Sequence, residues 1–371
     1  MIALDIEASN LIIPGKGVRE NALIKVKGRG SLYFETIMSP GFADAHAHPQ
    51  VIDAGLNGQL WRNSIEWIKH RKLQVDEAAL RKDTVLSKRL AEVVLMKSAL
   101  NGVTLIALVG SYKANFDAAV SLPYRPRAVI MPTVMTRNGW LYGRKMKLHL
   151  EKVRMLFNDG VMKPGVFVHS IHFANRSDIT LAYELSERLG IPFGIHLSEG
   201  TKDSEKLMRI LDRVTQKVVA VHCINEDCKK LGFNVVACPE SNITLYGKTV
   251  RDLSRIDAFG SDWPLILGTL GEQYRKLTRY YYDDDNPLKV LEKATLGGYA
   301  VYDVPRTGDI VCYDESPEKV LRGEAKPRHV FVNSKVVVEE GTIGGLTIRE
   351  VEKMADELSK TALEKYPLQR G

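Results

Sequence analysis

The chain has 371 residues, of which 44% are apolar and 26% are charged, and its formal net charge is +7. No apolar run approaches the ~18 residues that a membrane span needs, and the composition is ordinary for a globular protein. Lysine and arginine are spread among 45 acidic residues, which favours a mixed-charge surface over a nucleic-acid-binding one.

Cysteine usage and the N-terminus bear on the compartment. The four cysteines form no CxxC pair or other paired framework, which indicates a reducing compartment. The first fifteen residues contain Asp5 and Glu7 and lack the basic start of a secretory signal. We therefore expect a cytoplasmic protein.

From about residue 40 to 303, short apolar runs rich in β-branched residues alternate with longer amphipathic segments. Strands are predicted at residues 41–48, 103–110, 127–134, 165–172, 191–198, 218–225, 233–240 and 257–264. Near-continuous apolar character is typical of strands covered on both faces, as in a parallel sheet. Eight such strands alternating with helices predict a (β/α)8 TIM-like barrel over residues 39–304. Seven or nine units remain alternatives, because the third and eighth runs are the weakest.

Two segments between the strands have the clearest helix pattern. Residues 177–190, SDITLAYELSERLG, offer Ser177 or Asp178 as the N-cap and Gly190 as the stop. A second helix is predicted from Asp76 to Asn101, ending at Gly102.

The two ends of the chain differ from the middle. Residues 1–38 and 305–345 are rich in Val, Ile, Gly and turn signals, and we expect them to form one small composite β domain, sandwich-like, beside the barrel. Residues 346–371 predict a C-terminal helix, since Thr347 and Glu350 form a capping-box pattern. Its apolar stripe consists of Val351, Met354, Ala355, Leu358 and Ala362.

Polar groups gather where the predicted strands end. The chain has nine histidines, and five of them lie at or near such ends, as does Asp262: His46, His48, His169, His196 and His222. Catalytic groups of a barrel come from this rim, whereas unrelated histidines would scatter over helices and loops. Any one of these histidines alone would be interpreted as a core or loop residue, but six polar groups on one rim favour a metal site.

The pair His46 and His48 is two residues apart, so both side chains can face the barrel mouth from one strand. Imidazole nitrogens with a carboxylate suit zinc, with iron as the alternative. His196, Glu199 and Asp262 are further candidates. Glu199 follows His196 by three residues, just past the strand end, where it could carry protons without binding the metal.

Several segments together resemble the amidohydrolase superfamily, in its cytosine deaminase-like and chlorohydrolase-like branch. They occur in the family's order over about residues 39–303 and read PGFADAHAH, VHSIHFANRSDITLAYELSERLGIPFGIHLSE, AVHC, ACPESN and GSDWP. The tail GDIVCYDES…VFVNSKVVVEEGTI resembles the family's closing β segment.

The resemblance implies a hydrolase of C–N bonds other than peptide bonds. Its implied ligands for one divalent metal, zinc first, are His46, His48, His196 and Asp262. Glu199 matches the family's acid/base, His222 would contact the activated water, and His169 would contact the substrate. The alternative for Glu199 is a solvated carboxylate in a loop. The alternatives for His169 and His222 are a core histidine or a ligand of a second metal.

The metal count follows from one missing residue. Binuclear relatives bridge two metals with a modified lysine at the end of the fourth strand, where this chain has GVFVHSIH. The nearest lysine, Lys163, precedes that strand. One metal is therefore expected, which favours deamination.

The implied substrate is an amino-substituted heterocycle of the purine, pyrimidine or pterin type, from which a metal-bound hydroxide releases ammonia. Trp61 and Trp67 lie in a segment that resembles the family's pocket-covering loop, and they could stack on such a ring or simply pack. The alternatives are a cyclic-amide hydrolase of the imidazolonepropionase type and a catalytically silent metal-binding module. We expect a small-molecule heterocyclic substrate and neither a nucleic-acid nor a membrane partner. A homodimer is possible, because members of the family often form dimers.

Overall fold

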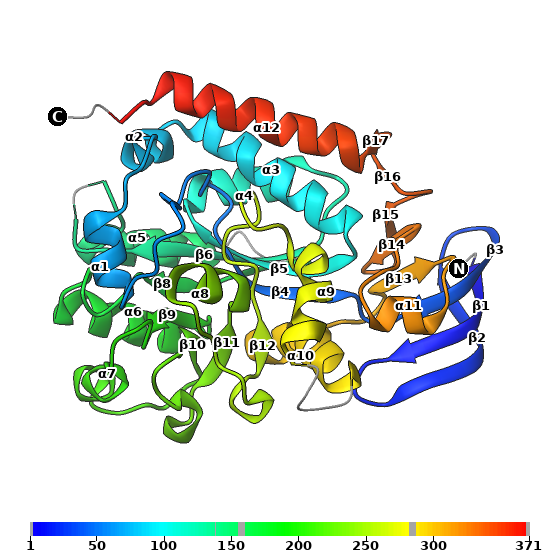
Figure 1. The fold of residues 1–371 in the computed structure, drawn as a ribbon, viewed down its shortest axis with the longest axis horizontal. Helices are drawn as coiled ribbons and strands as arrows, with labels where there is room; N and C mark the ends of the chain where they lie inside the picture. Colours follow the sequence, from blue (N-terminus) through cyan, green and yellow to red (C-terminus); the bar gives the residue numbers. More distant parts are fainter. Residues whose placement is uncertain (1–2, 138, 155–159, 282–286, 369–371) are drawn as a thin grey trace.

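The computed structural model describes residues 3–137, 139–154, 160–281 and 287–368. Parallel strands form a nearly closed barrel with helices around it, and a smaller sheet lies at one side (Figure 1). The chain therefore has the α/β barrel architecture that its alternating pattern predicts.

The eight predicted strands are present, and they follow one another around the barrel in chain order. They are β4 (Phe42–Ala47), β5 (Val103–Gly110), β6 (Arg127–Val134), β8 (Val166–Val168), β9 (Phe193–Leu197), β10 (Val218–His222), β11 (Asn234–Ala237) and β12 (Ala258–Phe259). A parallel bridge between Ala47 and Asp262 joins the first strand to the end of the last. This bridge brings the two ends of the barrel sequence together at the rim.

A short additional strand, β7 (Met162–Pro164), shares one barrel position with β8. The first half of β6 pairs with β7 and its last residues pair with β8. Two short strands, β7 and β8, thus share the fourth barrel position. The barrel therefore keeps eight strand positions.

Helices cover the outside of the barrel (Figure 1). They are α1 (Ser64–His70), α2 (Glu77–Lys82), α3 (Thr84–Leu100), α4 (Tyr112–Ser121), α5 (Gly143–Arg154), α6 (Arg176–Leu189), α7 (Ser204–Leu211), α8 (Pro239–Tyr246), α9 (Leu270–Tyr280) and α10 (Pro287–Tyr302). Two single 3-10 turns, Cys228–Leu231 and Leu253–Arg255, lie on either side of β11.

Two helix boundaries differ from the sequence prediction. The segment expected as one helix from Asp76 is broken at Asp83, which is the C-cap of α2 and whose side chain caps α3 by accepting from the amides of Val85 and Leu86. The N-cap of α6 is Asn175, in place of Ser177 or Asp178, and its side chain accepts from the Asp178 amide. In both cases a short polar side chain satisfies the free amides of a first turn. Gly190 ends α6 in a left-handed conformation as predicted.

Strands from both ends of the chain form one six-stranded sheet, where a sandwich-like arrangement was expected. Its order is β15-β14-β13-β3-β1-β2. The strands are β1 (Ala3–Ile13), β2 (Gly17–Lys27), β3 (Gly30–Met38), β13 (Ile310–Tyr313), β14 (His329–Val332) and β15 (Lys335–Val338). The pairing of β13 with β3 joins the C-terminal strands to the N-terminal ones.

The last part of the chain returns to the barrel. After α11 (Pro317–Leu321) and the small hairpin of β16 (Thr342–Ile343) and β17 (Leu346–Thr347), α12 (Ile348–Lys365) packs along α3 (Figure 1). Thr347 and Glu350 form the predicted capping box. Of the predicted stripe, Met354 is partly buried, and Val351, Ala355, Leu358 and Ala362 are buried.

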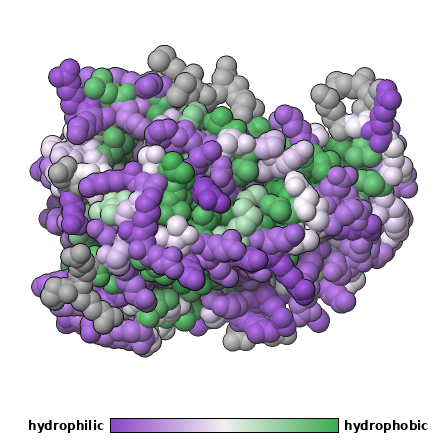
Figure 2. Space-filling view, turned by 90° about the horizontal axis from the view of Figure 1, so that it is seen from above, coloured by the Kyte–Doolittle hydropathy of each residue, from purple (hydrophilic) through white to green (hydrophobic). Residues whose placement is uncertain are grey.

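The face that carries α12 is mainly hydrophilic, with hydrophobic side chains between the polar ones (Figure 2). Exposed ion pairs of α12, such as Lys353–Glu357 and Lys360–Glu364, belong to this face. Among the described helices, none combines the length and apolar character needed to span a membrane.

Candidate metal centre and active-site pocket

Three imidazole nitrogens converge at the C-terminal rim of the barrel. The Nε2 atom of His46 lies 3.0 Å from Nε2 of His48 and 3.1 Å from Nε2 of His196, and the third side of this triangle is 3.3 Å. Hydrogen bonds cannot complete such a triangle, because a nitrogen that carries a proton has no free lone pair. Nitrogens bound to one tetrahedral zinc at about 2.0–2.1 Å lie about 3.3 Å apart. The spacing therefore fits one shared cation.

The strands explain why these three rings meet. His46 and His48 alternate with Ala47 at the end of β4, and His196 is the last residue but one of β9. Burial lowers the pKa of each ring below its ordinary value. The rings are therefore neutral near pH 7, with lone pairs available to a metal.

Asp262 adds a carboxylate to this cluster. Its Oδ1 lies 3.6 Å from the Nε2 atoms of both His46 and His48. Burial alone would raise the pKa of Asp262, but the neighbouring imidazoles, His46 first, hold it below the ordinary value. The carboxylate is ionised and ready to bind a cation.

Backbone contacts fix Asp262 against β4. Its amide donates to the His46 carbonyl at 2.9 Å, and the His48 amide donates to the Asp262 carbonyl at 2.6 Å. Asp262 has a φ of 63°, in the left-handed region that non-glycine residues rarely adopt. Gly260 permits this approach, because a Cβ there would lie 2.7 Å from the His46 Cβ. Such conformations cluster at functional sites.

Glu199 lies beside the triangle in a buried position. Burial raises the pKa of its carboxyl group. The Tyr246 hydroxyl donates to Oε1 at 2.7 Å, and the Nε2 atom of His222 lies 3.8 Å from the same oxygen. The group can therefore hold a proton and move it within the pocket.

His222 is oriented by Asn242, which belongs to α8. Nδ1 of His222 donates to the Asn242 side-chain oxygen at 2.8 Å, and Asn242 donates in turn to the Thr249 hydroxyl at 3.2 Å. Because the Nδ1 atom carries the proton, Nε2 presents its lone pair toward Glu199. His222 also has a left-handed φ, of 77°.

The other predicted residues take different places. His169 lines the pocket, its ring centroid 5.2 Å from that of His196, and burial lowers its pKa to about 3. Trp67 lines the pocket and packs against Trp263, with ring centroids 5.4 Å apart. Trp61 is buried among Trp67 and its neighbours and is not one of the described lining residues. His172 pairs with Asp203 at 3.2 Å, as suits a residue of the wall.

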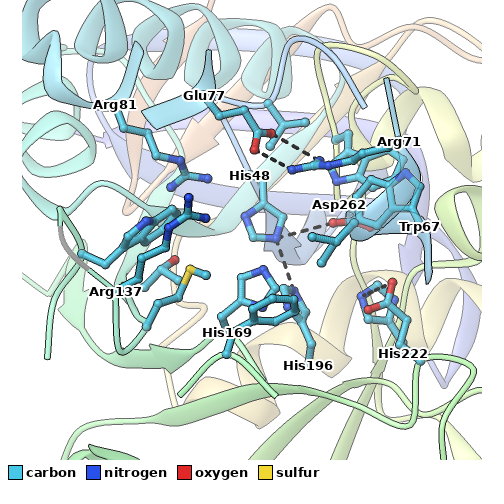
Figure 3. Close-up of a pocket in the computed structure, with 18 residues that line it drawn as sticks. His48, Trp67, Arg71, Glu77, Arg81, Arg137, His169, His196, His222 and Asp262 are labelled. Atoms are coloured by element: carbon cyan, nitrogen blue, oxygen red, sulfur yellow. Dashed lines mark hydrogen bonds and ion pairs between the residues drawn. The ribbon is translucent and has the colours of Figure 1, made fainter. Parts of the chain in front are cut away.

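The pocket above the triangle has a cavity volume of about 130 Å³ and opens to solvent. It contains several residues that the sequence analysis missed: Arg71, Glu77, Arg81, Arg137 and Trp140 (Figure 3). They come from the α1–α2 connection, from α2 and from the loop after β6, which carry no motif. Only the sequence signal for a pocket-covering loop after the first strand pointed to part of this region.

A second donor set shares Asp262. His222, Cys238 and Asp262 have potential ligand atoms within 4.8 Å of one another. Burial raises the pKa of the Cys238 thiol well above its ordinary value, and neighbouring carboxylates raise it further. A protonated thiol is a poor ligand. The histidine triangle is therefore the stronger metal site.

Lys163, the lysine nearest to the fourth predicted strand, lies on β7. It donates to the backbone oxygens of Tyr302 and Asp303 at 2.8 and 3.0 Å.

A search of protein-family models found no match, and a search of curated proteins found none either. The structure is nevertheless similar over nearly its whole length to solved structures. An adenosine deaminase from Xanthomonas campestris with bound zinc has a TM-score of 0.77 and 16% identity, over 97% of this chain and 98% of that one. A mutant of an atrazine chlorohydrolase from Arthrobacter aurescens, complexed with zinc and atraton, has a TM-score of 0.78 and 14% identity, over 96% and 100%. An amidohydrolase from a Sargasso Sea sample has a TM-score of 0.71 and 15% identity, over 98% and 99%.

The chain has the fold of these solved structures. The fold that the motif resemblance implies is therefore confirmed. In a (β/α)8 barrel, the rim that carries the histidine triangle is the end where active sites are built.

Proposed function

We propose that this protein is a metal-dependent aminohydrolase that holds one divalent cation, zinc first, and releases ammonia from an amino-substituted heterocycle. The observation that carries the proposal is the triangle of Nε2 atoms at 3.0–3.3 Å with the Asp262 carboxylate beside it. The adenosine deaminase and the atrazine chlorohydrolase of similar fold were both solved with zinc. Their activities support the class of reaction proposed here.

The donor set determines what a cation would contribute. Bound by His46, His48, His196 and Asp262, it would lower the pKa of a water toward neutrality and so supply the nucleophile. His222 faces the same space with the lone pair of Nε2, since Nδ1 is bound to Asn242. We propose that His222 and Asp262 orient the attacking water.

Glu199 is proposed as the group that moves protons. Burial raises its pKa and so extends the pH range over which it holds a proton. As water adds to the carbon that bears the amino group, Glu199 donates its proton to the adjacent ring nitrogen. One proton of the attacking water then goes to the departing nitrogen, and the other returns to Glu199 as the carbonyl forms, so that water and the amine become a carbonyl and ammonia.

Two alternatives use the same residues differently. A cyclic-amide hydrolase of the imidazolonepropionase type would open a ring without releasing ammonia. A silent metal-binding module would need neither Glu199 nor His222, yet Glu199 is buried against Tyr246 and His222 against Asn242. Burying a carboxyl group costs free energy that a silent protein has no reason to retain.

The test combines metal analysis with a turnover screen. Purified protein is expected to hold about one zinc or iron per chain and to release ammonia from at least one purine, nucleoside, pyrimidine or pterin. Chelation should abolish turnover and re-addition of the metal should restore it. Ring opening without ammonia would favour the cyclic-amide alternative. Metal-replete protein that turns over no member of a broad panel would contradict the proposal.

A further inference from the structure

The active-site pocket has a second polar end, away from the metal ligands. Figure 3 shows the guanidinium groups of Arg81 and Arg137 together on the side of His48 opposite to Asp262 and His222. Both arginines line the pocket. Arg81 belongs to α2 and is half-buried, while Arg137 follows β6 and stands at the exposed mouth.

These two arginines differ from the third arginine of the pocket. Arg71 is neutralised by Glu77, whose carboxylate oxygens lie 2.6 and 3.4 Å from its guanidinium nitrogens. Among the described residues, neither Arg81 nor Arg137 forms an ion pair with a carboxylate, and Glu77, whose charge also acts on Arg81, is bound by Arg71. Two like charges thus share one space with a single carboxylate that is already paired.

Arg81 is held in position by an aromatic ring. Its guanidinium carbon lies 4.3 Å from the centroid of the Trp140 ring, a cation–π contact that leaves the N–H edge free for another partner. Burial lowers the pKa of Arg81. The Glu77 carboxylate offsets part of the cost of desolvating this charge and Arg71 adds to it, so an anionic ligand would offset the remainder.

Neutral donors without partners surround the same space. The Thr133 hydroxyl is buried and has no hydrogen-bond partner among the described residues, and the same holds for Nδ1 of His169. Thr133, Arg81 and Trp140 also line an adjoining cavity, of about 650 Å³ including its mouth. The pocket therefore provides both room and donors beyond the metal end.

The charges of the whole pocket favour an anion at this end. Arg71 and Glu77 cancel, and Asp262 and Glu199 lie at the metal end with His46, His48 and His222. The charges that remain at the other end are those of Arg81 and Arg137. A neutral nucleobase can accept hydrogen bonds from a guanidinium group but leaves its charge uncompensated, whereas a carboxylate or phosphate accepts in a bidentate geometry and also supplies the opposite charge.

We propose that the substrate carries an anionic substituent, a carboxylate or a phosphate monoester, which Arg81 and Arg137 bind while its aminated ring faces the metal end. The proposal deepens the proposed function and rests on it for the orientation of the ring. It makes Arg81 and Arg137 the residues that determine specificity for anionic over neutral heterocycles.

The test measures binding and does not depend on turnover. Zinc-loaded protein is titrated calorimetrically with benzoate, phenyl phosphate and the neutral benzamide, which share one ring and differ in the substituent. Wild-type protein is expected to prefer at least one of the two anions over benzamide by about tenfold for each arginine engaged. The better anion identifies the carboxylate or the phosphate as the natural group. The variants are R81M, R137M and the double variant, with R62M as a control, since Arg62 pairs with Glu66 on the surface.

The double variant should lose the preference for the anion, and R62M should keep it. Anion binding that survives the double substitution would place the anion on the metal and overturn the proposal. An equal affinity of the wild-type protein for anions and benzamide, or no binding of either anion, would also overturn it. A preserved preference with no ammonia release from any heterocycle would reject the proposed function alone.

Discussion

The two ends of the barrel bury polar groups in opposite ways. At the end near the small sheet, Arg127 donates to both carboxylate oxygens of Asp309 at 2.7 and 2.9 Å, and also to the Gly160 and Thr307 carbonyls. At the rim, the Nε2 atoms of His46, His48 and His196 lie 3.0–3.3 Å from one another, where hydrogen bonds cannot satisfy all three. Arg127 and Asp309 are saturated, whereas the rim histidines leave hydrogen-bonding capacity unused.

This difference separates a structural charge from a functional one. A buried ion pair whose remaining donors and acceptors are bound belongs to the fold, because removing one partner leaves the other unpaired. Buried polar atoms without partners lower stability unless a ligand meets them. Substitutions at the Arg127 end should therefore reduce stability, and those at the rim should reduce activity.

The largest expected effect is on turnover at the rim. E199Q should lower kcat by about 10²–10⁴-fold while metal content and the free energy of unfolding stay close to wild type, because Gln keeps the shape but carries no transferable proton. Steady-state kinetics with metal analysis and chemical denaturation measure this. E66Q is the matched control, since Glu66 is a carboxylate at the surface that binds Arg62. Turnover of E199Q close to that of E66Q would refute the proton-transfer role.

The next effect is on stability at the opposite end. R127M should lower the free energy of unfolding by about 3–5 kcal/mol, because it leaves Asp309 buried without its partner. The double variant R127M/D309L removes both charges and should recover much of that loss. Denaturant unfolding of the metal-free proteins measures both. A single variant as stable as the wild type, or a double variant less stable than the single, would break the contrast between the two ends.

The smallest effect concerns a surface contact between α12 and the barrel. Asp83 caps α3 and also accepts from the Lys365 amine at 2.7 Å and the Tyr366 hydroxyl at 2.8 Å. Its backbone hydrogen bond from Leu86, followed by the contact with Lys365, lowers the pKa of Asp83. D83A should cost about 1 kcal/mol at neutral pH, mostly from the lost cap.

The pH dependence of this effect has a definite sign. Because the pKa is lower in the folded state, the ionised carboxylate stabilises the fold above its unfolded pKa of about 3.9. This contribution disappears as the pH falls from that value toward the folded pKa. The stability difference between wild type and D83A should therefore shrink below about pH 4, as thermal melts can show. A difference that is constant over this range would contradict the assignment.

The sequence predicted those features that depend on local order. The apolar runs predict the eight strands. Five site residues follow the ends of these strands and are therefore predicted to lie on one rim of the barrel: His46, His48, His196, His222 and Asp262. The break between α2 and α3 at Asp83 was missed because the helical sequence pattern continues across it. The capping role of the Asp83 side chain is visible only in the structure, where α3 begins as a separate helix. The start of α6 was misplaced by two or three residues because Asn175, Ser177 and Asp178 are all good N-caps.

The arginine end of the pocket could not be predicted. Arg81 and Arg137 are 56 residues apart in the printed sequence (137 − 81) and meet only because α2 and the loop after β6 fold over the same side of the rim. Neither lies in a motif, and a basic residue on a helix is usually solvated. The roles of individual site residues are predictions that the experiments above test, and the domain bounds stay a prediction.

The central claim is that the His46–His48–His196 triangle holds the cation. Crystals of zinc-loaded protein, measured at the zinc absorption edge, should show one anomalous peak about 2.0–2.1 Å from the three Nε2 atoms, with Asp262 as the fourth protein neighbour. A principal peak between His222 and Cys238, or at a surface site with the triangle empty, would contradict the account.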